Sequence, residues 1–135
     1  MTMKILVAED EEITREILVE TLKKWEYEVT AVENGKEALD VLLQPSPPPI
    51  VLLDWKMPVM DGLVTLRNIR SHDELKNVYV ILLTSVGDQV SVQRAIGAKA
   101  NDYILKPYNI DNLRERLAKA REFLEDKLSS DPSAG

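Results

Sequence analysis

The chain of 135 residues contains no cysteine, which excludes disulfide bonds, thiolate catalysis and cysteine-ligated zinc. Aromatic residues make up only 5% against 44% for hydrophobic residues overall, so we expect a core of aliphatic side chains. No apolar run approaches the ~20 residues that span a bilayer. Residues 1–12 contain no apolar stretch of signal-peptide length. We therefore expect a soluble, cytoplasmic protein with a single domain of ordinary size.

Positive charge is in deficit. The chain carries 17 lysines and arginines against 23 acidic residues, a formal net charge of −6. A chain this acidic lacks the electrostatic footprint of a nucleic-acid-binding domain. The same charge disfavours an anionic membrane surface. We expect no direct nucleic-acid partner and no membrane partner.

Short apolar runs alternate along the chain with longer stretches of helical periodicity. The apolar runs predict five strands, at residues 3–8, 27–32, 50–53, 78–83 and 101–105. The periodic stretches predict five helices, at residues 13–25, 36–43, 63–70, 88–97 and 110–128. This strict alternation predicts an α/β protein, in which right-handed crossovers connect a parallel sheet with helices on both faces.

The proline-rich residues 44–49 are predicted to be an extended loop, because a strand follows at once and too little core precedes them for a separate domain. The predicted domain spans residues 1–128, and residues 129–135 are expected to be a disordered tail or the start of a linker. The last helix has an apolar face at spacings of four, three, four and four: Leu113, Leu117, Ala120, Leu124 and Leu128. Its length leaves open a dimer seam or a junction to a further domain.

Polar side chains follow the predicted strands where each one ends. In an open α/β sheet, ligands bind outside the carboxyl ends of the strands. The sequence places there Glu9, Asp10 and Glu11 after the first strand, Asp54 after the third, Thr84 after the fourth and Lys106 after the fifth. If the sheet forms as predicted, these groups meet at one edge.

Carboxylates that lie close together repel one another and call for a cation between them. Magnesium suits a site with one or two carboxylates, retained waters and a phosphate oxygen. Lys106 supplies a compact positive charge that can pair with Asp54 and later with a phosphoryl oxygen, to which Thr84 can donate its hydroxyl. An aspartate carboxylate is also a nucleophile that forms aspartyl-phosphates. The predicted edge therefore suits phosphoryl transfer to Asp54, with Mg²⁺ as cofactor.

Four segments occur in order at a characteristic spacing. They are residues 5–11 (ILVAEDE), 53–62 (LDWKMPVMDG), 83–85 (LTS) and 97–107 (GAKANDYILKP). Together they resemble the successive motifs of response-regulator receiver domains in two-component signalling and phosphorelays. The resemblance implies a flavodoxin-like, doubly wound, five-stranded parallel sheet of order 2-1-3-4-5 with five helices.

The resemblance implies a role for each residue at this edge. Asp54 would accept a phosphoryl group from a phosphohistidine on a sensor histidine kinase or a histidine phosphotransfer protein. Asp10, Asp54 and the backbone carbonyl of Lys56 would ligate Mg²⁺, and Glu9 would hold a metal-bound water. Lys106 would contact the phosphoryl oxygens. The acidic pair is Glu-Asp where Asp-Asp is usual, which leaves the role of Glu9 less defined than that of Asp10.

The resemblance also implies a switch formed by Thr84 and Tyr103. Thr84 would move to the phosphoryl group and the Tyr103 ring would rotate inward, which reshapes the face made by the fourth helix, fifth strand and fifth helix. That face would control an output protein or a linked effector domain, or form a homodimer. The peptide bond between Lys106 and Pro107 would be cis. Such a domain catalyses only its own phosphorylation and autodephosphorylation, and is not an enzyme for outside substrates.

Three other functions remain as alternatives. A Mg²⁺-dependent phosphatase or phosphotransferase of the haloacid-dehalogenase type would need Asp two residues after the nucleophile, where this chain has Lys56, and a cap domain. A phosphorylation-independent pseudo-receiver scaffold would not need the acceptor, metal and lysine residues that are all present. A flavin-binding protein would need a phosphate-binding loop after the first strand, where carboxylates stand instead.

Three further residues receive simpler interpretations. Glu11 is expected to belong only to the start of a helix, where acidic residues are favoured. His72, the one histidine, is expected to be a solvated loop residue rather than a phosphodonor or metal ligand. Trp55 is expected to pack beside Asp54 without chemistry and to report on it by fluorescence.

Overall fold

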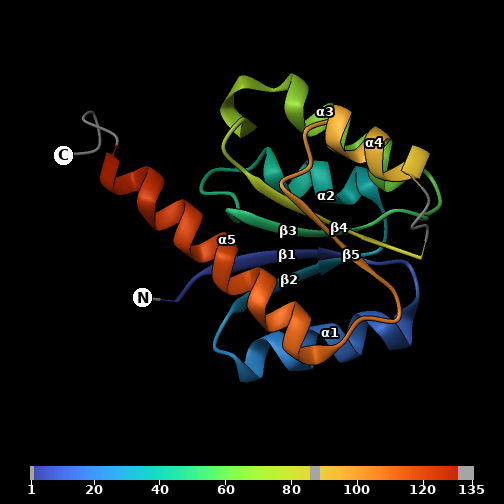
Figure 1. The fold of residues 1–135 in the computed structure, drawn as a ribbon, viewed down its shortest axis with the longest axis horizontal. Coiled ribbons are helices and arrows are strands. Elements are labelled where there is room, and N and C mark those ends of the chain that lie inside the picture. Colours follow the sequence, from blue (N-terminus) through green and yellow to red (C-terminus); the bar gives the residue numbers. More distant parts are fainter. Residues whose placement is uncertain (1, 86–88, 131–135) are drawn as a thin grey trace.

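The sheet of this protein contains five parallel strands in the order β2-β1-β3-β4-β5. The computed structural model describes residues 2–85 and 89–130. The strands are β1 (Lys4–Ala8), β2 (Glu28–Val32), β3 (Ile50–Asp54), β4 (Tyr79–Thr84) and β5 (Asp102–Leu105). The helices are α1 (Glu12–Lys24), α2 (Gly35–Leu42), α3 (Gly62–Ser71), α4 (Gln89–Gly97) and α5 (Ile110–Ser130). The predicted flavodoxin-like fold and strand order are confirmed (Figure 1).

The sheet is covered on both faces (Figure 1). One apolar cluster joins alternate strand residues such as Ile5 and Leu52 to α1 and α5. The other joins the intervening residues, such as Leu6 and Val51, to side chains of α2, α3 and α4. Successive strand side chains point to opposite faces, so a strand covered on both faces must be apolar throughout.

The central strands show this two-sided burial most fully. All five residues of β3 and all six of β4 are buried. At the sheet edge, β2 is mostly exposed, which fits its weaker apolar pattern: Glu28 precedes Val29, and Thr30 and Ala31 separate Val29 from Val32. The aliphatic residues are therefore concentrated in the central strands. Their packing holds the ends of β1 and β3 in place.

Two helices begin at side-chain caps that the sequence marks. The Asn34 side chain accepts a hydrogen bond from the Glu37 amide at 2.9 Å, and the Asp61 side chain accepts one from the Val64 amide at 2.8 Å. These bonds satisfy amide groups that the first helical turn leaves unpaired. Asn34 and Asp61 therefore fix where α2 and α3 start.

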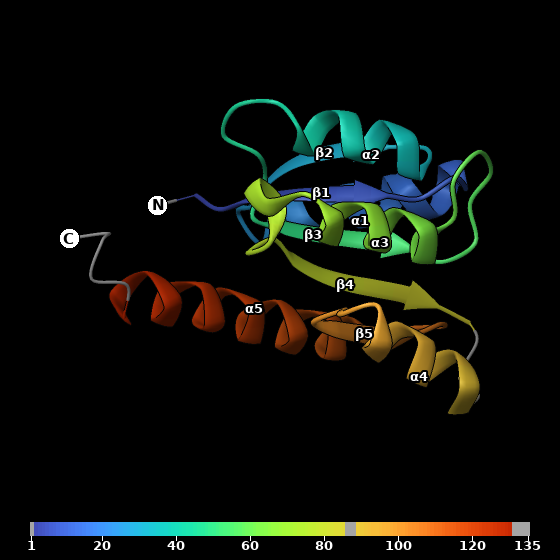
Figure 2. The ribbon, with the colours of Figure 1, turned by 90° about the horizontal axis from the view of Figure 1, so that it is seen from above.

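The structure adds elements that the periodicity did not predict. A 3₁₀ turn, η1 (Asp73–Leu75), follows α3, and its Leu75 side chain is buried in the apolar core. Helix α5 continues to Ser130, two residues beyond the predicted end, and its last turns extend past the strands (Figure 2). Within the predicted tail, residues 131–135 lie outside the described residues, and so does the Leu128 side chain. None of the described helices is long and apolar enough to span a membrane.

Candidate functional site

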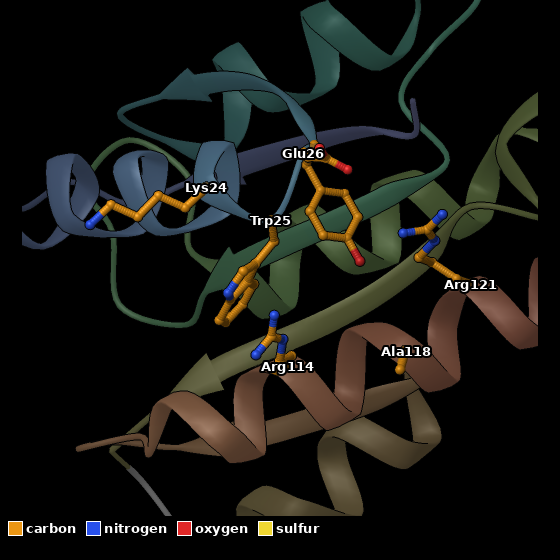
Figure 3. A pocket seen from close by; sticks show the side chains of 7 residues that line it. Lys24, Trp25, Glu26, Arg114, Ala118 and Arg121 are labelled. Carbon is orange, nitrogen blue, oxygen red and sulfur yellow. The ribbon is translucent and has the colours of Figure 1, made fainter. Parts of the chain in front are cut away.

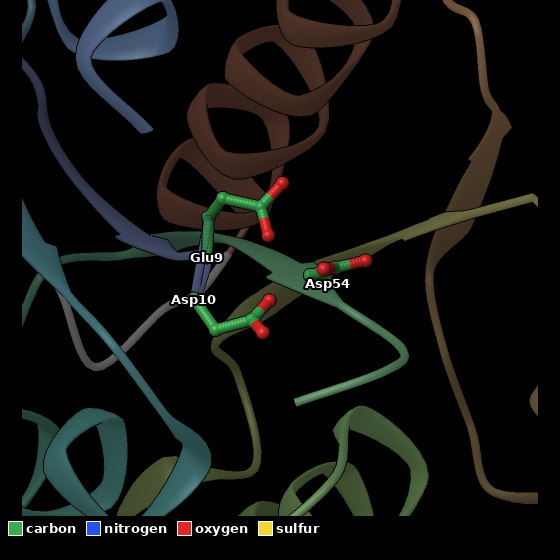
Figure 4. A group of neighbouring side chains, drawn as sticks. All are labelled: Glu9, Asp10 and Asp54. Carbon is green, nitrogen blue, oxygen red and sulfur yellow. The ribbon is translucent and has the colours of Figure 1, made fainter. Parts of the chain in front are cut away.

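Three carboxylates meet at the carboxyl edge of the sheet. Glu9 follows β1, Asp10 is next in the chain, and Asp54 is the last residue of β3. Each offers an oxygen that lies within 4.8 Å of the others, and Figure 4 shows the three side chains directed toward one another. Glu9 is 1% exposed and Asp54 5% exposed, whereas Asp10 is open to solvent. The predicted convergence of these carboxylates is confirmed.

Lys106 places one ammonium group between two of these carboxylates. Its Nζ lies 3.1 Å from Asp54 Oδ1 and 3.1 Å from Glu9 Oε1, as a hydrogen-bonded ion pair with each. The pairing with Asp54 was predicted, and the pairing with Glu9 was not. Residue 9 is therefore a direct partner of the lysine, in addition to its predicted contact with metal-bound water.

The charges of Glu9 and Lys106 depend on each other. Burial raises the pKa of Glu9 above its ordinary value, and the nearby Asp54 raises it further, while Lys106 acts in the opposite direction. Burial lowers the pKa of Lys106, but hydrogen bonds and charges from Asp54 and Glu9 outweigh it, so the net pKa is raised. The lysine is therefore held as a cation at neutral pH, where it can meet an incoming anionic oxygen.

One cation does not neutralise three carboxylates. Glu9 Oε2 is buried, and no described group hydrogen-bonds to it. A buried oxygen without a donor is costly, and a hard divalent cation with bound water removes that cost. The oxygen-only set of Glu9, Asp10 and Asp54 fits Mg²⁺ in kind and in charge. That Asp10, Asp54 and the Lys56 carbonyl ligate it, with Glu9 acting through water, stays a prediction.

Gly62 lets α3 start against the Asp54 backbone. The Gly62 amide donates to Trp55 O at 2.7 Å, and the Trp55 amide donates to Leu83 O at 2.9 Å. A Cβ at position 62 would lie 2.4 Å from Asp54 O and 2.8 Å from the Trp55 Cα, which backbone atoms cannot accommodate. Only glycine permits this closeness, so the loop after Asp54 is held by backbone packing on both sides.

Arg15 is a functional residue that sequence reasoning missed. Its Nη1 donates to the carbonyl of Glu9 at 2.9 Å and to that of Asp10 at 3.3 Å, and its Nη2 lies 3.6 Å from a Glu33 carboxylate oxygen. The guanidinium thereby holds the backbone that carries two of the three carboxylates. Arg15 stands three residues after the acidic run of residues 9–12, and nothing else in the sequence marks its contact with backbone carbonyls.

Thr84 and Tyr103 lie near the site on the face of the sheet that α2, α3 and α4 cover. Thr84 ends β4 and is buried, while Tyr103 lies on the adjacent β5 in register with Leu82. Residues 82 and 84 share a face of the sheet, so the two side chains project toward the same side. The Tyr103 ring is partly buried against the cluster that contains Ala95 of α4. The positions suit the predicted switch, whose movement stays a prediction.

Secondary expectations have mixed outcomes. The Lys106–Pro107 peptide bond is cis, as expected. Trp55 is half-buried in a hollow beside the acidic residues, lined by Asp10, Trp55, Lys56, Met57, Pro58 and Asp61. His72 is half-buried rather than solvated, and its Nδ1 lies 2.8 Å from the Asn68 carbonyl in a hydrogen bond. Glu11 occupies the N-cap position of α1, but its side chain does not cap the helix amides.

A doubly wound parallel sheet with an acidic pocket and one lysine at its carboxyl edge defines the class of receiver-type signalling domains. The chain belongs to the family of response regulator receiver domains: the family model matches residues 5–118. This membership makes it a component of two-component signalling, in which receiver domains act as switches rather than as metabolic enzymes and bind Mg²⁺ at an acidic pocket.

The alignments with two curated relatives cover nearly the whole length of those proteins. The chain is 35% identical over 116 residues to chemotaxis protein CheY1 of Helicobacter pylori, an alignment that covers 85% of this chain and 94% of the relative. It is 34% identical over 119 residues to sporulation initiation phosphotransferase F of Bacillus subtilis, with 88% and 94% covered. The phosphate regulon regulator PhoB of Rhizobium meliloti is 32% identical, but the match covers only 51% of that longer protein.

Solved structures share the fold. Chemotaxis protein CheY4 of Vibrio cholerae superposes with a TM-score of 0.83 at 25% identity, over 89% of this chain and 99% of that chain. The receiver domain of sensor histidine kinase PA1611 from Pseudomonas aeruginosa superposes with a TM-score of 0.78 at 28% identity, over 88% and 97%. That structure has a magnesium ion coordinated in its active site cleft.

Proposed function

We propose that Asp54 accepts a phosphoryl group from a phosphohistidine donor, and that this modification switches the α4–β5–α5 face. The observation that carries the proposal is the Lys106 ammonium, 3.1 Å from both Asp54 Oδ1 and Glu9 Oε1, beside Asp10 in a receiver fold. The donor would be a sensor histidine kinase or a histidine phosphotransfer protein in the cytoplasm.

In this transfer, a carboxylate oxygen of Asp54 forms a bond to phosphorus while the bond from phosphorus to the donor imidazole nitrogen breaks. The electron pair of that bond stays on the imidazole nitrogen. Lys106 moves its hydrogen bonds to a phosphoryl oxygen, where charge accumulates. Asp10, Asp54 and the Lys56 carbonyl would hold Mg²⁺, which would supply the remaining positive charge.

The response follows from the position of Thr84 at the end of β4. Its hydroxyl turns to a phosphoryl oxygen, and the Tyr103 ring moves inward on the same face of the sheet. Exposed apolar residues already mark the outer surface there: Val90 is 65% exposed, Ile96 65% and Leu105 45%. A change at Tyr103 alters this surface, which then controls an output protein, a linked effector domain or a second copy of the chain.

Trp55 fluorescence tests the proposal. We expect Mg²⁺ to change the emission of the wild-type protein, and beryllofluoride, a mimic of the phosphoryl group, to change it further. Asp54→Asn should abolish the second response. Lys36→Met, which removes an exposed lysine of α2, serves as the control and should respond as wild type. A beryllofluoride response that persists in Asp54→Asn contradicts the proposal, and turnover of unrelated phosphomonoesters would favour a phosphatase.

A further inference from the structure

A second charged site lies at the opposite end of α1. Helix α1 contains 13 residues, so its two ends are about 20 Å apart. The hollow at its carboxyl end is formed by the turn into β2 and by α5 (Figure 3), and its lining residues are Lys24, Trp25, Glu26, Tyr27, Arg114, Ala118 and Arg121. Its volume of about 320 Å³ is large enough for a small ligand.

Two arginines of α5 are held against aromatic rings in this hollow. The Arg114 guanidinium carbon lies 5.2 Å from the Trp25 ring centroid, and that of Arg121 lies 5.6 Å from the Tyr27 ring centroid. Arg121 also acts on the Tyr27 hydroxyl, because its hydrogen bond and charge lower the pKa that burial raises. The rings therefore limit where the two guanidinium groups lie, and their remaining N–H donors can meet a ligand.

Neither arginine forms an ion pair with a described carboxylate. Among the side chains that the structure describes, the ion pairs involve Arg15, Lys36, Lys106 and Arg116, but not Arg114 or Arg121. The chain has 23 acidic residues and a net charge of −6, so two guanidinium groups outside these ion pairs in one hollow depart from its overall character. Lys24 and Glu26 stand at the rim, where their charges offset each other.

The spacing of the two arginines favours a ligand that carries two linked anionic groups. They are seven residues apart, two turns of α5, which places their Cα atoms about 10 Å apart along one side of the helix. Ala118 lies between them and leaves room for a ligand above the helix. We propose that this hollow binds a diphosphate-bearing small molecule, such as a nucleoside diphosphate, with one phosphate at each guanidinium. Phosphate oxygens match the planar guanidinium fork in geometry and charge.

The test uses Trp25 as the reporter in a Trp55→Phe background, with EDTA present and the ionic strength held constant with chloride. Pyrophosphate, ADP and orthophosphate are the probes. We expect saturable binding of pyrophosphate, and binding of orthophosphate weaker by about tenfold because it meets only one fork at a time. Tighter binding of ADP would show that the base adds a contact, and equal binding would show that only the diphosphate is recognised.

A charge-matched pair of variants provides the control. Arg114→Gln/Arg121→Gln should lose pyrophosphate binding, whereas Lys23→Gln/Lys119→Gln, which removes two exposed cations outside the hollow, should retain it. Amide chemical shifts offer a second readout that does not depend on Trp25, with changes expected at residues 24–27 and 114–121. Absence of saturable binding, equal loss in both double variants, or binding of an acidic peptide but of neither diphosphate would overturn the proposal. Made with Trp55 retained and measured without EDTA, each double variant should keep its Mg²⁺ response at the Asp54 site, so failure here leaves the switch proposal standing.

Discussion

The two ends of α1 carry charges of opposite sign: carboxylates cluster at one end and arginines at the other. At its amino end, Glu9, Asp10 and Asp54 lie close together, two of them are buried, and the Lys106 ammonium pairs with Glu9 and Asp54. At its carboxyl end, Arg114 and Arg121 line a hollow, and neither forms an ion pair with a carboxylate in the part of the chain that the structure describes. The first end is short of positive charge and the second is short of negative charge. Each therefore favours a ligand of the sign that it lacks, a cation in one case and an anion in the other.

The largest effect is expected for Lys106→Met, which removes the ammonium group that pairs with the Glu9 and Asp54 carboxylates. Without the ammonium group, charge that develops on the phosphoryl oxygens is no longer stabilised by the protein. We expect phosphorylation of Asp54 by acetyl phosphate to slow by about 100-fold. Stopped-flow recording of Trp55 fluorescence measures this rate. Lys36→Met is the matched control, and an unchanged rate in Lys106→Met would remove the lysine from the proposed chemistry.

A smaller effect is expected for Arg15→Ala. The variant removes the hydrogen bonds to the carbonyls of Glu9 and Asp10, so the carboxylates of these two residues are less well positioned. We expect Mg²⁺ affinity to fall by about tenfold, as for other residues that orient metal ligands. A Mg²⁺ titration followed at Trp55 measures it. Arg67→Ala, which removes an exposed arginine of α3, should bind as wild type, and equal affinities in the two variants would contradict the role of Arg15.

Glu9 should give the acidic end a characteristic pH dependence. Because the pKa of Glu9 in the folded protein is raised above 4.5, the folded state retains a proton that the unfolded state releases. Its contribution to the free energy of unfolding therefore decreases as the pH rises above 4.5. We expect the free energy of unfolding of Glu9→Gln to exceed that of the wild-type protein at neutral pH, by an amount that shrinks as the pH falls toward 4.5. Urea unfolding without Mg²⁺ measures this, and a difference independent of pH would be inconsistent with it.

The smallest effect is expected at the other end, for Arg114→Gln. Loss of the contact with Trp25 should lower the free energy of unfolding by about 0.5–1 kcal/mol. The Mg²⁺ titration at Trp55 should not change, because the two ends of α1 are about 20 Å apart. Thermal unfolding beside Lys119→Gln provides the comparison. A weakened Mg²⁺ response in Arg114→Gln would show that the two ends are coupled.

The sequence predicted the sheet and the acidic end well, for a physical reason. Strands buried on both faces require continuous apolar runs, and those runs show where each strand ends and so which polar residues meet. For this reason the sequence predicts that Asp54 and Lys106 lie close together, as their 3.1 Å contact shows. Strands β1, β2, β4 and β5 each start one residue later than predicted, so the exposed edge strand β2 was located as well as the buried strands.

Features that depend on contacts between distant segments could not be predicted in this way. Arg15 contacts backbone carbonyls, which carry no sequence signal, and the Glu9–Lys106 pair depends on how deeply Glu9 is buried. The second helix was predicted to start at residue 36, whereas Asn34 caps α2 and Gly35 begins it. The pairing of Arg114 with Trp25 requires the packing of α5 beside α1, which periodicity does not specify.

The most direct test of the account is the intact mass of the protein after incubation with acetyl phosphate and Mg²⁺. We predict that the wild-type protein gains a single phosphoryl group, that hydroxylamine removes it as expected for an acyl phosphate, and that Asp54→Asn gains none. A hydroxylamine-labile phosphoryl group on Asp54→Asn, or none on the wild-type protein, would contradict the assignment of Asp54 as the acceptor.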